Sequence, residues 1–163
     1  MPDSESLNDW ILCLEILLNG LQCIEGSHNI ILEAYIYQIM LTLFLDQDEE
    51  QCRMIVEKLI SNLNNSLLSQ PELIIITHTL LGMMSENKSL LECEQNYMMS
   101  LLILHKLYGD PRGRGALGIP WELFITWRLS IIARLQNKLQ DAEYVEELFD
   151  ACVINLKHNK FNE

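Results

Sequence analysis

Residues 110–121 read DPRGRGALGIPW, and Gly113 to Gly118 within them match the G-x-G-x-x-G pattern of dinucleotide-binding loops. Such a loop needs a β-strand that runs directly into its first glycine, because the turn must deliver the pyrophosphate to the next helix N-terminus. The preceding residues are YGDPR, with a proline and charges where that strand would end. A P-loop is excluded as well, because Gly118 is followed by Ile-Pro. The stretch is therefore interpreted as a glycine-rich loop between helices, and no nucleotide cofactor is expected.

The sequence on both sides of this loop has the hydrophobic spacing of helices. Capping boxes at Ser69–Glu72 and Ser89–Glu92 mark two helix starts. The segment that follows the first box, LIIITHTLL, is rich in β-branched residues and is the least helix-like of the set. Seven helical segments are predicted, at about 7–24, 29–45, 46–63, a fourth that begins at 69, 89–108, 120–139 and 141–158.

The predicted fold class is all-α. Consecutive helices joined by short turns favour antiparallel hairpins, which form either a compact bundle or a short armadillo- or HEAT-like stack. No linker or low-complexity segment interrupts the chain. We therefore expect one helical domain over residues 1–163, either complete or excised from a longer protein.

Charge and cysteine content limit the environment of the protein. The net charge of −12 disfavours binding to nucleic acid and to anionic membranes. The five cysteines are odd in number and widely spaced, and the N-terminus is too acidic for a secretory signal. Both features predict a reducing compartment, the cytoplasm or the nucleus.

Catalytic and metal-binding patterns are weak. DQDEEQCRMIVE, residues 46–57, places acids at several positions of a calcium loop, but Gln51 stands where the tight turn requires glycine. The histidines and cysteines show no short paired spacing, and no nucleophile motif occurs. Neither an enzyme nor a metal or other cofactor is predicted.

The most distinctive segment covers residues 111–140, which carry a net charge of +4 in an otherwise acidic chain. Arginine and tryptophan are frequent anchors of protein interfaces, and long ordered loops are often functional. A partner with an acidic or amphipathic segment is expected to dock there. The candidate partner-binding residues are Arg112, Arg114, Trp121, Trp127, Arg134 and Lys138.

Arg128 lies in the middle of the apolar arc of its helix, where a charge needs either an acid or a route to solvent. Glu33 is similarly placed among the apolar residues Ile36, Met40 and Phe44. A structural ion pair between Arg128 and Glu33 is therefore predicted, with exposure at a core edge or in a partner-binding face as the alternatives.

The leading functional prediction is a non-catalytic interaction domain, a scaffold or adaptor in an intracellular complex. One alternative is a ligand-binding or enzymatic domain in which Arg112 and Arg114 hold a phosphate or carboxylate. Another is a structural homo-oligomer whose exposed Met and Leu residues form the self-interface.

Overall fold

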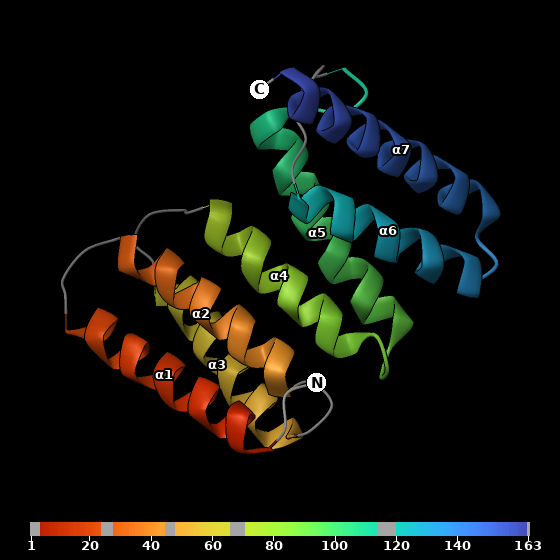
Figure 1. The fold of residues 1–163 in the computed structure, drawn as a ribbon. Coiled ribbons are helices and arrows are strands. Elements are labelled where there is room, and N and C mark those ends of the chain that lie inside the picture. The colour runs from red at the N-terminus through yellow and green to blue at the C-terminus, as the bar shows by residue number, and fades with distance from the viewer. Residues whose placement is uncertain (1–3, 24–27, 45–47, 66–70, 114–119, 163) are drawn as a thin grey trace. The chain divides into compact units, whose positions relative to one another are not determined.

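The computed structural model describes residues 4–23, 28–44, 48–65, 71–113 and 120–162. Within these ranges the chain forms seven helices and no strand (Figure 1). The prediction of an all-α protein is thus confirmed. The helices are α1 (Ser4–Gln22), α2 (His28–Phe44), α3 (Glu49–Asn65), α4 (Pro71–Ser85), α5 (Leu90–Tyr108), α6 (Pro120–Leu135) and α7 (Leu139–Asn162).

Helix α4 contains the β-branched segment that resembled a strand. The apolar residues of this segment nonetheless form a regular helix, and most of them are buried. The Thr79 hydroxyl donates a 2.7 Å hydrogen bond to the Ile75 carbonyl one turn earlier, so this polar group is satisfied within the helix. Tertiary burial therefore outweighs the strand propensity of the segment.

Caps define the ends of α5 and α6. The Ser89 side chain accepts a hydrogen bond from the Glu92 backbone N–H, which confirms one half of that capping box, and Gly109 ends α5 with φ of 81°. Asn137 has φ of 58°, and the Lys138 N–H donates to the Ala133 carbonyl. This Schellman-type turn ends α6 at Leu135, earlier than predicted. The Ser69 capping box lies outside the described residues.

Packing divides the chain into two compact units, residues 1–80 and 81–163. The boundary falls inside the continuous helix α4. The expected single domain therefore stays a prediction, and each unit is described by itself.

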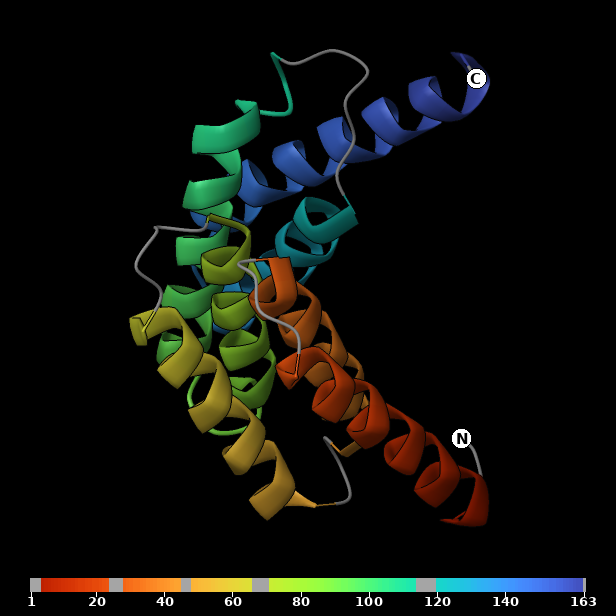
Figure 2. The same ribbon diagram turned by 90° about the vertical axis from the view of Figure 1, so that its left-hand side faces the viewer.

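The first unit contains α1, α2 and α3, which run side by side in alternating directions (Figures 1 and 2), together with most of α4. On each of α2, α3 and α4, three buried core residues are spaced at positions i, i+3 and i+7. These core residues are Ala34, Tyr37 and Leu41, then Cys52, Ile55 and Leu59, and then Leu73, Ile76 and Leu80. Leu7, Leu14 and Leu18 supply the buried side of α1.

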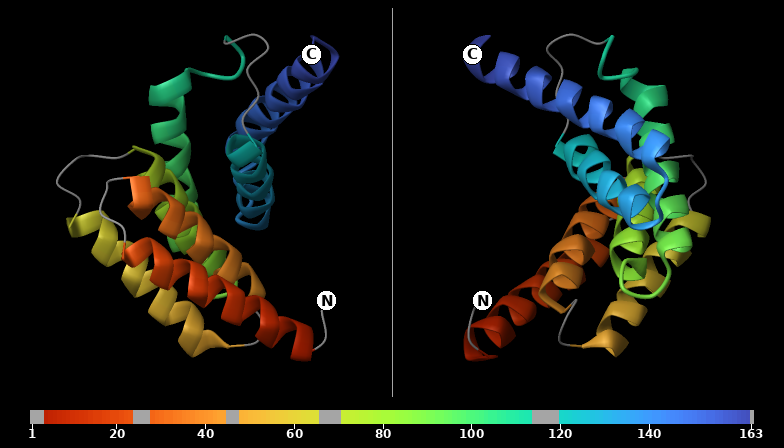
Figure 3. Two further views of the ribbon diagram at one scale, coloured as in Figure 1. Left: turned by 60° about the vertical axis from the view of Figure 1, so that its left-hand side comes forward. Right: turned by 90° about the vertical axis from the view of Figure 1, so that its right-hand side faces the viewer.

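The second unit contains the last turn of α4 with α5, α6 and α7, and α7 lies along α6 (Figure 3). Tyr97 is its largest fully buried side chain. A Cβ atom at Gly82 would lie only 2.6 Å from two carbons of the Tyr97 ring, so the ring packs directly on the α4 backbone. The ring of Phe124, from α6, meets Tyr97 edge-on with centroids 6.1 Å apart.

Candidate functional site

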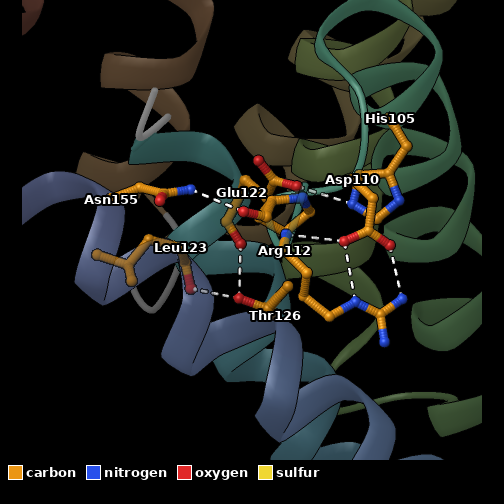
Figure 4. A network of polar contacts seen from close by, with 8 residues as sticks. His105, Asp110, Arg112, Glu122, Leu123, Thr126 and Asn155 are labelled. Atoms are coloured by element: carbon orange, nitrogen blue, oxygen red, sulfur yellow. Dashed lines mark hydrogen bonds and ion pairs between the residues drawn. The ribbon is translucent and has the colours of Figure 1, made fainter. Parts of the chain in front are cut away.

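Arg112, the first predicted binding residue, lies in the turn after α5 and is already engaged within the chain (Figure 4). Its Nε and one terminal nitrogen donate to the two carboxylate oxygens of Asp110, over 2.9 and 2.6 Å. The guanidinium also lies 5.1 Å from the centre of the Tyr144 ring and 3.7 Å from the Glu147 carboxylate. Arg112 therefore ties the loop to α7. Arg114, its predicted companion, lies outside the described residues.

Hydrogen bonds from Arg112 lower the pKa of the Asp110 carboxyl from 3.8 to about 2. A depressed pKa means that the interaction stabilises the fold above pH 4 and is lost as the pH falls through about 2. Asp110→Asn should therefore lower the free energy of unfolding at pH 7 by less than about 1 kcal/mol, because the Asp110 side chain is 38 % exposed.

Urea denaturation of wild type and Asp110→Asn between pH 7 and pH 2 measures the difference in their free energies of unfolding. This difference should shrink as the pH approaches 2. A difference that stays constant from pH 7 to pH 2 would show that Asp110 stabilises the loop without its charge.

Arg128 contacts the acid Glu86 of its own unit. The predicted pair with Glu33, a residue of the first unit, stays a prediction. The Nε and one terminal nitrogen of Arg128 donate to the two Glu86 oxygens over 2.7 and 2.6 Å. On α2 the Tyr37 hydroxyl donates a hydrogen bond to Glu33, and burial, together with the charge of Glu33 and this bond, raises the pKa of Tyr37. Glu86 follows α4 in a turn that has no apolar periodicity, so the hydrophobic pattern of the sequence does not identify it as a partner of Arg128.

Removing the Arg128 side chain should destabilise the second unit, because it leaves Glu86 partly buried without its cation. The two side chains are 25 % and 21 % exposed, so we expect Arg128→Ala to cost about 2 kcal/mol, less than for a fully buried pair. Chemical denaturation measures the loss. Arg134→Ala, in a more exposed pair, serves as the control and should cost about 0.5 kcal/mol. Equal losses would contradict the buried character of the Arg128–Glu86 pair.

The two remaining cations of the predicted binding segment are also paired. Arg134 donates to both carboxylate oxygens of Glu146 on α7, and Lys138 lies 2.9 Å from the Glu94 carboxylate on α5. Each described cation predicted to bind a partner thus faces an acid of the second unit. The described cations of the segment that has a net charge of +4 in sequence are therefore opposed by acids in the fold. A binding role for these residues stays a prediction.

Two polar contacts that involve buried groups join α5 to α6, and Pro111 to α7, within the second unit (Figure 4). The carboxylate of Glu122 is fully buried, and its Oε1 lies 2.7 Å from Nε2 of His105. The buried Asn155 side chain donates a 2.9 Å hydrogen bond to the Pro111 carbonyl. Sequence analysis missed Glu122, although it precedes Ile125 by three residues and Leu129 by seven and so shares their buried side.

The predicted tryptophan anchors differ in exposure. Trp121 is half-buried, whereas Trp127 keeps 46 % of its surface exposed. The Trp127 ring lies 4.9 Å from the Arg128 guanidinium and meets Phe124 edge-on. Internal contacts therefore already occupy part of the Trp127 surface.

The most exposed large apolar residues of α1 form a surface that sequence analysis did not identify. We name this surface the α1 face. Its members, each 56–62 % exposed, are Trp10, Leu12, Ile16 and Leu17. At about 100° per residue, Leu12 and Ile16 lie opposite the buried Leu7, Leu14 and Leu18, whereas Trp10 and Leu17 lie nearer to one edge of that buried stripe. The signal was present in the sequence, since α1 holds more large apolar residues than one packed stripe can bury.

Beside the α1 face lies a shallow, open hollow bordered by Ser6, Asp9, Trp10 and Cys13, all of which belong to α1. At about 100° per residue, Asp9 lies between Cys13 and Ile16 on the helix circumference, so a carboxylate is placed among apolar neighbours. No cation among the described residues forms an ion pair with Asp9. The hollow therefore combines an aromatic ring with a carboxylate.

The comparisons with known proteins do not extend this description: no protein family, curated protein or solved structure matches the chain. None of the described helices is long and apolar enough to cross a membrane. Within the same residues, no group of three or more His, Cys, Asp or Glu side chains is arranged to hold a metal ion.

Proposed function

We propose that this protein is a non-catalytic protein-interaction module and that the α1 face is its docking surface. The observation that carries the proposal is the exposure of four large apolar side chains on one helix, each more than half in water. Single exposed apolar residues are ordinary, whereas a contiguous exposed apolar patch is typical of an interaction site. Tryptophan, present here as Trp10, is also the residue type most enriched among binding hot spots.

The contacts of the second unit favour a structural role for its polar residues. Arg112, Arg128, Arg134 and Lys138 are each held by a carboxylate, and Glu122 is buried beside His105. These groups stabilise the positions of the helices. An apolar helix face, by contrast, is suited to receive an amphipathic helix that lays its own apolar side against it.

The exposed thiols of Cys13 and Cys23 support an intracellular setting for this module, because neither forms a disulfide. Exposed thiols of this kind are typical of reducing compartments, so we propose that the protein acts in the cytoplasm or nucleus.

Affinity purification with quantitative mass spectrometry tests the proposal when wild type is compared with Ile16→Gln/Leu17→Gln. A control, Glu15→Gln/Asn19→Ser, changes the polar side of the same helix. The apolar variant should lose at least one protein that both wild type and the control retain, while helical circular dichroism stays unchanged. Identical sets of captured proteins in all three samples would contradict the docking role of the α1 face.

A further inference from the structure

Resting on the proposed function, we infer that the partner of the α1 face is a cationic amphipathic helix, one of whose Lys or Arg side chains enters the hollow between Asp9 and Trp10. The inference concerns the chemistry of the occupant. Three features of the first unit support the inference: its net negative charge, the small number of its own basic residues, and the residues that border the hollow.

The negative charge of the chain is concentrated in the first unit. Residues 1–80 hold 12 acids and 2 bases, a net of −10, whereas residues 81–163 hold 11 acids and 9 bases, a net of −2. A surface in this unit therefore attracts cations and repels acidic segments before any contact is made. This charge reverses the sign that sequence analysis expected of the partner.

The two bases of the first unit do little to offset that charge. Arg53 is held between Glu50 and Glu57 on the exposed side of α3, where its hydrogen bonds and charge lower the pKa of Glu50. Lys58 is then the one further base in residues 1–80. An incoming cation thus competes with few internal cations for the acids of this unit.

The hollow is suited to the head of a long basic side chain. Asp9 supplies a carboxylate, and Trp10 supplies an indole ring. Tryptophan gives the strongest cation–π attraction of the aromatic residues, and arginine or lysine can pass its methylene stem over apolar atoms such as those of Cys13. The neighbouring Ile16 and Leu17 then receive the apolar side of the same helix.

Two fluorescein-labelled model peptides test the inference by fluorescence anisotropy with the full chain. Each has about 18 residues, with leucines at the same positions of one helix face. One carries lysine at the polar positions and the other carries glutamate. The protein variants are Asp9→Asn and, as a matched control, Glu15→Gln, which removes the same charge from the polar side of α1.

The lysine peptide should bind wild type at least tenfold more tightly than the glutamate peptide. Asp9→Asn should weaken the lysine peptide by roughly three- to tenfold, because it removes a charge partner at the contact, while Glu15→Gln stays within about twofold of wild type. Raising the salt concentration from about 0.05 to 0.5 M should weaken the lysine peptide further, since screening shortens the reach of the acidic unit.

Other outcomes separate this inference from the proposed function. The inference of a cationic partner would be overturned by equal affinities for the two peptides or by no binding of either. Equal effects of Asp9→Asn and Glu15→Gln would also overturn it. A dimer in sedimentation equilibrium that Ile16→Gln/Leu17→Gln dissociates would also overturn it, because the occupant would be a second copy. If the lysine peptide binds Ile16→Gln/Leu17→Gln as tightly as wild type, the docking role of the α1 face itself fails.

Discussion

Tyr97→Ala is expected to lower the free energy of unfolding by about 4 kcal/mol, in the range for truncating a buried aromatic ring. The ring is fully buried between the α4 backbone at Gly82 and the ring of Phe124. Its hydroxyl donates a 2.8 Å hydrogen bond to Glu86, the acid that binds Arg128. Both burial and the neighbouring Glu86 raise the pKa of Tyr97, so the hydroxyl keeps its proton. Truncation therefore leaves a cavity and removes one hydrogen bond from the ion pair.

Urea denaturation followed by helical circular dichroism measures this loss, with Tyr97→Phe as the control. Phenylalanine retains the ring but not the hydroxyl, so its cost should be only about 1–2 kcal/mol. If Tyr97→Ala and Tyr97→Phe cost the same, the packing of the ring on α4 would not be the main source of stability at this position.

The second large effect concerns binding. Trp10→Ala should weaken the affinity for the protein captured through the α1 face by roughly 30-fold or more, the loss of about 2 kcal/mol that defines a hot spot. Because Trp10 is mostly exposed, the same change should leave the unfolding midpoint nearly unchanged.

Trp127→Ala provides a matched control, since it removes an exposed tryptophan from the second unit. Isothermal titration calorimetry with the captured protein should give an affinity within about twofold of wild type. A stronger effect of Trp127→Ala than of Trp10→Ala would move the docking surface to α6, where sequence analysis first placed it.

The helices were predictable because their signals are local. Ser89 and Glu92 mark a helix start within four residues, and the positive φ of Gly109 suits a residue without a side chain. The acid that pairs with Arg128 was not predictable in the same way, because Glu86 lies 42 positions away in a turn. Only tertiary packing brings these two residues together.

The exposed apolar residues of α1 were missed for a related reason. The apolar residues of α1 surround much of the helix, and the sequence does not say which of them pack inward. Leu14 and Leu18 do, whereas Ile16 and Leu17 remain exposed. The same limit applies in the second unit, since the acids that pair with Arg134 and Lys138 come from other helices.

Site-specific photo-crosslinking tests the docking role of α1 most directly, because it reports contact and not only affinity. A photoreactive phenylalanine analogue placed at Ile16 lies in the α1 face, and one placed at Glu15 lies on the polar side of the same helix. Illumination in living cells should give a discrete adduct with one partner protein from position 16 and much less from position 15. Equal adducts from the two positions, or none from position 16, would contradict the assignment of the α1 face as the docking surface.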